Sequence, residues 1–145
     1  MTLLNEYQQI LLWLESEIVQ VQTLSFPADP AQSNSAVVRL LEDKPTMVAA
    51  AAWEANRKYE IVYVHDTIEQ VMQVMEDLQD KLYQERRIPI STNGAVHEFL
   101  SYHLFAPERT ANNLVQMRAE LLIKTRVMRS AATVPKMADI HTNIQ

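Results

Sequence analysis

The sequence predicts an α+β fold, with a mainly antiparallel sheet of about four strands, two helices packed on one face of it and an extended C-terminal arm. Residues 2–22 and 66–84 repeat apolar side chains at spacings of three and four, as amphipathic helices do. Residues 59–63 and 115–127 alternate apolar and polar side chains with period two, as half-buried strands do. The resulting order, α-β-β-α-β-β, predicts one sheet covered by one layer of helices.

Composition excludes several classes of function. The chain has 145 residues, a net charge of −5 and no cysteine, which excludes a disulfide scaffold, a thiol nucleophile and an iron–sulfur cluster. The single glycine, Gly94, excludes glycine-rich phosphate loops and the G-x-S-x-G elbow. A protein that binds nucleic acid over its whole surface would be basic, so the net charge of −5 argues against that function. We expect one α+β domain over residues 1–130, an arm or tail over 131–145, and no membrane span or export signal.

The first helix is predicted over residues 2–22 because apolar side chains recur on one face, with Glu6 on another. A coiled-coil seam is the alternative, but the apolar face is wider than a seam requires. A loop over 25–35, a short buried strand over 36–41 and a turn over 42–45 follow. The residues of the predicted apolar face are Leu4, Tyr7, Leu11, Leu14, Ile18 and Val21.

The middle of the chain predicts a strand followed by a helix. The strand begins near Trp53 and places Tyr59, Ile61 and Tyr63 on one face. The alanine run 49–52 either prolongs this strand or forms a helical turn, and the pattern leaves both open. Asp66 is predicted to cap the second helix, with Glu69 completing a capping box.

Two further strands are predicted, over residues 96–105 and 115–127. In the second, the odd positions are almost all apolar and the even positions almost all polar. A helix is the competing interpretation, because many of these residues are good helix formers. We favour the strand, because a helix would scatter Arg118, Glu120 and Lys124 among the apolar positions.

Candidate chemistry is sparse. His97 and His103 lie six apart on a predicted strand and are expected to share a face, but metal binding needs a third ligand. His65 and Asp66 suggest an acid–base pair, although a helix cap explains Asp66 better. No serine has a recognisable histidine and acid partner. We therefore predict no catalytic, cofactor or metal site, and no enzymatic activity.

A partner interface is the better candidate for function. Tryptophan is enriched at binding hot spots, and clustered arginines bind acidic surfaces. Plain core packing and solubilising charge are the alternative roles of these residue types. The candidate interface residues are Trp53, Arg86, Arg87, Arg126 and Arg129.

The arrangement of these segments resembles the tail terminator (tail completion) proteins of long-tailed bacteriophages and the related minor capsid proteins. The loop FPADPAQSNS precedes the strand VVRLL, and WEANRKYEIVYV leads directly into the helix DTIEQVMQVMEDLQDKLY. RRIPI follows, and then AELLIKTRVMRS, which is expected to be a long exposed-edge strand. The resemblance covers roughly residues 1–130 and rests on this order of segments. The alanine run and the tail after Ser130 depart from it.

The resemblance implies a structural protein of the virion tail, assembled in the host cytoplasm. It implies a ring, usually a hexamer, that docks on the last ring of the tail tube protein, stops polymerisation and presents a surface to the head connector. DNA passes through the lumen without specific binding, and no cofactor or membrane is involved. The alternatives are a head-completion or adaptor connector protein and a small α+β ligand-binding or enzymatic domain.

Overall fold

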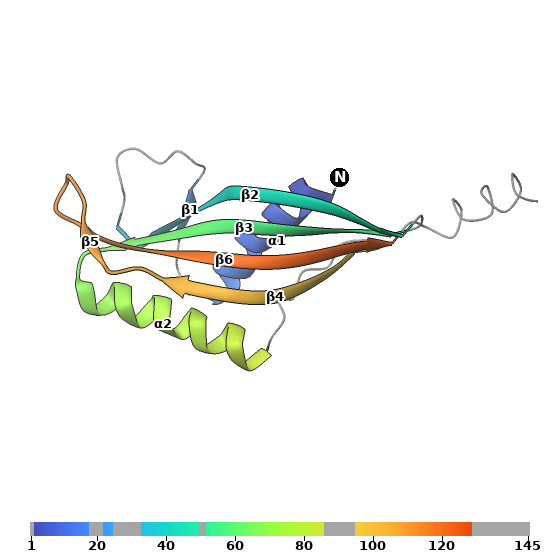
Figure 1. Ribbon diagram of the computed structural model, residues 1–145. Coiled ribbons are helices and arrows are strands. Elements are labelled where there is room, and N and C mark those ends of the chain that lie inside the picture. Colours follow the sequence, from blue (N-terminus) through green and yellow to red (C-terminus); the bar gives the residue numbers. More distant parts are fainter. Residues whose placement is uncertain (1, 18–21, 25–32, 50–51, 86–94, 129–145) are drawn as a thin grey trace, which may run out of the picture.

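The computed structural model describes residues 2–17, 22–24, 33–49, 52–85 and 95–128. Figure 1 shows a long twisted sheet packed against two helices, which confirms the predicted α+β fold. The predicted arm, 131–145, lies outside the described residues. The elements are α1 (Thr2–Glu17), β1 (Gln22–Leu24), β2 (Ser35–Ala49), β3 (Ala52–His65), α2 (Ile68–Glu85), β4 (Ala95–Leu104), β5 (Glu108–Arg109) and β6 (Val115–Met128).

Over the described residues the sheet has six strands in the order β1-β2-β3-β6-β4, with the short β5 also paired to β6. All pairs are antiparallel except that of β1 with β2. The last strand of the described chain, β6, lies between β3 and β4 and pairs with β3 along its whole length, from Val115 opposite His65 to Met128 opposite Ala52. The prediction that this segment forms an exposed edge is therefore wrong, because strands bond to it on both sides.

Burial along β6 confirms the strand over the competing helix. Its odd residues, from Val115 through Leu121 and Ile123 to Thr125, are buried, and its even residues are partly exposed. In β3, Tyr59, Ile61 and Tyr63 are likewise buried on the face that packs against the helices. This shared parity puts both helices on one face of the sheet, as predicted.

The predicted turn at residues 42–45 is wrong. β2 continues through it to Ala49, with a bulge between Leu40 and Glu42. Proline lacks a backbone donor and is tolerated in an edge strand. Beyond residue 37, β3 is the only described strand that pairs with β2, so Pro45 lies at an edge of the described sheet. The alanine run ends one strand and begins the next, since Ala49 pairs with Ala52.

Thr67, not Asp66, caps α2. The Gln70 N–H donates to the Thr67 hydroxyl oxygen at 3.4 Å, and the Val71 N–H donates to the Thr67 carbonyl oxygen at 3.2 Å. Thr67 and Gln70 thus stand in the capping-box positions predicted for Asp66 and Glu69. The backbone N–H of Asp66 instead donates to Nδ1 of His65 at 2.7 Å.

The buried face of α1 is rotated from the predicted one. Ile10, Trp13 and Leu14 enter the core, whereas Leu4 is exposed. Glu6 is fully buried, although the sequence predicted it on a polar face. No helix in the described part of the chain is long and apolar enough to cross a membrane. The core residues of the two helices are Ile10, Trp13, Leu14, Val71, Met75, Leu78 and Leu82.

Candidate assembly interface

One face of the sheet carries no described helix and is rich in charge. Its side chains alternate along β2, β3 and β6 with those buried under α1 and α2. We call this surface the helix-free face. Its charged residues on these three strands are Arg39, Glu42, Lys44, Glu54, Lys58, Glu60, Arg118, Glu120, Lys124 and Arg126.

A row of paired side chains crosses the helix-free face. Glu60 on β3 accepts hydrogen bonds from Arg39 of β2 at 2.9 Å and from Arg118 of β6 at 3.0 Å. The Arg118 guanidinium lies 4.2 Å from the ring centroid of Phe105, and that ring packs edge-on against His103 of β4. The row therefore links all four long strands through polar and aromatic contacts.

A second charge group lies nearer the β2–β3 hairpin. Glu54 accepts a hydrogen bond from Nε of Arg126 at 2.9 Å and lies 3.6 Å from the Lys124 ammonium. The hydrogen bond from Arg126 and the charges of both cations outweigh desolvation and hold the pKa of Glu54 below its ordinary value. Lys58 lies 3.9 Å from Glu120 between the two groups. Opposite charges thus alternate along the length of the face.

In each of these pairs the cation reaches further into solvent than the carboxylate. The side chain of Glu60 is 9% exposed, whereas that of Arg118 is 41% exposed. Glu54 is 18% exposed and its partner Arg126 is 52% exposed. The same order holds for Lys44 against Glu42 and for Lys58 against Glu120. Within each ion pair the cation is therefore the more accessible partner.

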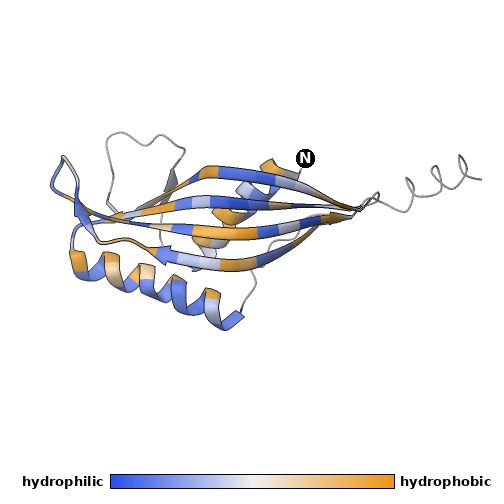
Figure 2. Ribbon diagram, viewed as in Figure 1, coloured by the Kyte–Doolittle hydropathy of each residue, from blue (hydrophilic) through white to orange (hydrophobic). Residues whose placement is uncertain are grey.

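The layer of helices has the opposite character. Together α1 and α2 carry eight carboxylates and one lysine, a net charge of −7. The described strands carry eight cations and seven carboxylates, a net charge of +1. Figure 2 shows hydrophilic residues along most of α2. The acidity of the chain is therefore concentrated on one side of the fold.

A buried polar cluster attaches α1 to the other face of the sheet. Oε1 of Glu6 accepts a hydrogen bond from the Tyr59 hydroxyl at 2.6 Å. Oε2 of Glu6 accepts from Nη1 of Arg57 at 3.1 Å and from the Thr125 hydroxyl, and lies 2.6 Å from Nδ1 of His97. Donors from β3, β6 and β4 thus converge on one carboxylate, which sets the position of the helix.

The same contacts decide the charge of Glu6. Burial alone would raise the pKa of this carboxyl. Hydrogen bonds from His97, Thr125 and Tyr59, together with the charge of Arg57, outweigh burial and hold the pKa of Glu6 below its ordinary value. Burial and the neighbouring carboxylate raise the pKa of Tyr59, which therefore stays a neutral donor. Glu6 is ionised in the fold, and its charge is balanced by Arg57.

The structure places two of the five predicted interface residues. Arg126 belongs to the helix-free face. Trp53 is half-buried, and Cζ of Arg57 lies over its ring, 5.8 Å from the ring centroid. Arg86, Arg87 and Arg129 lie outside the described residues. The sequence analysis did not identify Arg39, Glu60 or Arg118 as interface residues. Polar and apolar residues visibly alternate around them, but which of them pair depends on the register between distant strands.

His97 and His103 do not share a face, contrary to the prediction. A register shift between Phe99 and Ser101 adds one residue to β4, which reverses the side-chain alternation beyond it. His97 is therefore buried against Glu6, whereas His103 is exposed. Among the described residues no group of three or more His, Asp or Glu is placed to hold a metal ion.

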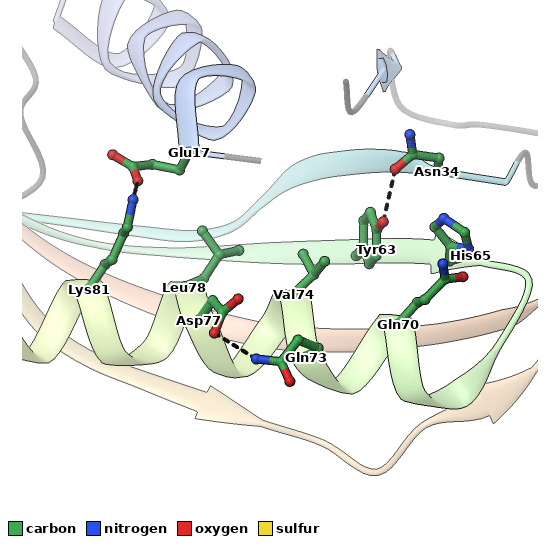
Figure 3. A pocket seen from close by; sticks show the side chains of 10 residues that line it. All are labelled: Glu17, Asn34, Tyr63, His65, Gln70, Gln73, Val74, Asp77, Leu78 and Lys81. Atoms are coloured by element: carbon green, nitrogen blue, oxygen red, sulfur yellow. Dashed lines mark hydrogen bonds and ion pairs between the residues drawn. The ribbon is translucent and has the colours of Figure 1, made fainter. Parts of the chain in front are cut away.

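A cavity of about 420 Å³ lies between the end of α1, β3 and α2 (Figure 3). Its polar side chains bind one another: Lys81 pairs with Glu17, Gln73 donates to Asp77 at 2.9 Å, and the Tyr63 hydroxyl donates to Asn34 at 2.9 Å. His65 and Gln70 complete the polar wall. The volume is within the range of small-molecule sites.

The comparisons with known proteins add no family to this geometry. No protein-family model matches the chain, and no curated protein sequence matches it.

Proposed function

We propose that this chain is a structural assembly protein of a bacteriophage tail. It caps the tail tube as a ring, stops the addition of further tube subunits and offers its outer surface to the head connector. DNA passes through the lumen of this ring without specific binding. The protein acts without a cofactor, in the virion, after assembly in the host cytoplasm.

The observation that supports this proposal most is the separation of charge between the two layers of the fold. In the ion pairs of the helix-free face the cation is the more exposed partner, and the helices carry a net charge of −7. A subunit with two unlike surfaces favours head-to-tail contacts, and such contacts close into rings. The order of elements resembles that of tail terminators, and this resemblance is the reason for proposing a ring on the tail tube.

Growth of tail tubes in the presence of the purified protein tests the proposal. We expect tubes of shorter and more uniform length, each with a distinct end ring, in negatively stained electron micrographs. A closed hexamer would have a mass of about 100 kDa, six times that of the 16.7 kDa chain. Tubes whose growth and ends are unaffected by the protein would refute the terminator function.

Two alternatives make different predictions. A head-completion or adaptor protein would bind the connector and leave tube growth unchanged. Such adaptors are more often helical, and the strand at Val115–Met128 makes this alternative weaker. The cavity beside α2 favours a small ligand-binding domain, which would show a rise in melting temperature in a thermal-shift ligand screen.

A further inference from the structure

The outer side of α2 is acidic, whereas the more exposed partners in the ion pairs of the helix-free face are cations. Glu69, Glu76 and Asp80 are exposed and lie on the side of the helix opposite its buried residues. The outer side also exposes apolar atoms, since the side chain of Met72 lies among these acids and is 45% exposed. An 18-residue helix is about 27 Å long, so this acidic surface extends over about half of a 14-residue strand.

The helix-free face is complementary to this surface. Its cations are more exposed than their carboxylate partners, and half-buried Val62 and Leu122 lie between them on β3 and β6. On this face Lys58, Arg118 and Lys124 are each more exposed than the carboxylate they pair with, so they are available to acidic side chains of another molecule. Apolar and charged groups therefore match across the two surfaces.

Pairing through strand edges is the obvious alternative, and the edges oppose it. Apart from the short β1 and β5, the strands at the edges are β2 and β4; each contains a bulge, and β2 also contains Pro45. The Tyr7 hydroxyl donates to the Val38 carbonyl oxygen at 2.8 Å at one edge, and the Tyr83 hydroxyl accepts from the Tyr102 N–H at 3.5 Å at the other. Bulges, proline and covering side chains are the devices that prevent edge-to-edge pairing.

We propose that the acidic outer side of α2 in one copy of the chain docks on the helix-free face of the next copy. The two surfaces lie on opposite layers of the protomer, so each copy uses one surface toward each neighbour. The contact is heterologous and repeats around a ring. This inference rests on the proposed ring and names the surfaces that build it.

Carbodiimide cross-linking of the full chain tests the contact directly, because this reagent joins a lysine to a carboxylate only where the two touch. A mixture of isotopically light and heavy protein identifies links between copies by mass spectrometry. We expect mixed-isotope links from Lys58 and Lys124 to Glu76 and Asp80. Mixed-isotope links confined to other segments, or no such link at any attainable protein concentration, would overturn the proposal.

Charge reversal provides a second test with an internal control. The pair Lys58→Glu and Lys124→Glu makes the helix-free face acidic, and the pair Glu76→Lys and Asp80→Lys makes α2 basic. Either pair alone should weaken self-association in sedimentation equilibrium by at least about tenfold. The chain with all four changes keeps the native net charge and should regain association, as should a 1:1 mixture of the two pair variants. Failure of both to regain it contradicts the proposal.

Three controls separate the possible outcomes. The neutral pair Lys58→Gln and Lys124→Gln replaces the reversal if circular dichroism shows that the acidic pair does not fold, and it should weaken association less. Glu108→Lys, on the exposed β5, should leave association unchanged. DNA is another acidic partner that this face could bind, and fluorescence anisotropy with a labelled duplex tests it. If the native chain binds the duplex, the Lys58 and Lys124 variants lose that binding, and no self-association is detected, the proposal is overturned.

The result is separable from that of the tube assay. Capping of tubes that is indifferent to all of these charge changes would refute the docking contact and leave the terminator function standing. Rescue by the four-change chain without any effect on tubes would establish the contact and refute the terminator function.

Discussion

Glu6 is the residue whose removal should damage the fold most for its size. Its carboxylate is fully buried and accepts hydrogen bonds from the Arg57 and Tyr59 side chains. Glu6→Ala leaves these donors without their acceptor, so we expect a loss of about 3–5 kcal/mol in the free energy of unfolding, measured by urea denaturation. The exposed Glu15→Ala on the same helix should change it by less than about 0.5 kcal/mol. An equal effect of the two changes would contradict the buried cluster.

The pH dependence of stability follows from the same carboxylate. The pKa of Glu6 in the fold lies below that of an unfolded glutamate, about 4.3, so the unfolded chain takes up the proton first as the pH falls. The stabilisation by Glu6 is complete above the unfolded pKa and is lost as the pH falls through the folded pKa. The difference in unfolding free energy between the native chain and Glu6→Ala should therefore shrink from pH 7 to pH 3. A difference that grows toward acid would reverse the assigned sign.

At the scale of elements, two neighbouring residues at the start of α2, Asp66 and Thr67, should differ in their contribution to stability. Thr67→Ala removes the oxygen that accepts the Gln70 N–H and should cost about 1 kcal/mol, whereas Asp66→Ala should cost little. Chemical denaturation of the two variants measures the difference. The opposite ranking would restore Asp66 as the cap of α2.

The central strand offers a matched pair of leucines on opposite faces. Leu121 is fully buried against the helices, so Leu121→Ala should cost about 2–5 kcal/mol. Leu122 is half-buried on the helix-free face, and Leu122→Ala should cost clearly less. The midpoints of denaturant unfolding compare the two. Similar losses would mean that the strand is covered on both faces.

The elements that the sequence predicted well are those with an intrinsic repeat. The alternation over 115–127 and the helical spacing over 66–84 depend on local side-chain order, and both elements exist as predicted. The neighbours of β6 in the sheet depend on pairing between distant residues, such as Glu60 opposite Glu120, which no local pattern contains. The continuation of β2 through Pro45 was missed for a related reason, because its edge position decides that proline is tolerated.

The candidate sites were harder to predict, because they combine distant elements. Glu6 looked like a solvent-facing acid, but it recurs with Ile10 and Trp13 at spacings of four and three, which is the one local signal of its burial. Its partners Arg57, His97 and Thr125 come from three strands. On the helix-free face, each cation is more exposed than its carboxylate partner, and this difference depends on how the side chains pack, which composition does not determine.

At the scale of the whole molecule, the predicted arm remains to be tested. Residues 131–145 lie outside the described residues, and their role in assembly stays a prediction. Deleting them should leave the melting temperature nearly unchanged, since the described sheet ends at Met128, and should weaken tube capping. Differential scanning calorimetry and the tube-growth assay measure the two effects. A large fall in melting temperature would show that the segment belongs to the folded domain.

The central place of β6 also has a consequence for the order of folding. β2 and β3 are neighbours in the chain and pair as a hairpin, so they associate soon after synthesis. Among the described strands β4 pairs only with β6, which is the last of them to be synthesised. Residues 95–104 must therefore wait, unpaired, until the final strand inserts between β3 and β4. Folding of this domain is completed only when its last strand is released, and a nascent chain that stops before Val115 lacks the strand that joins the two halves of its sheet.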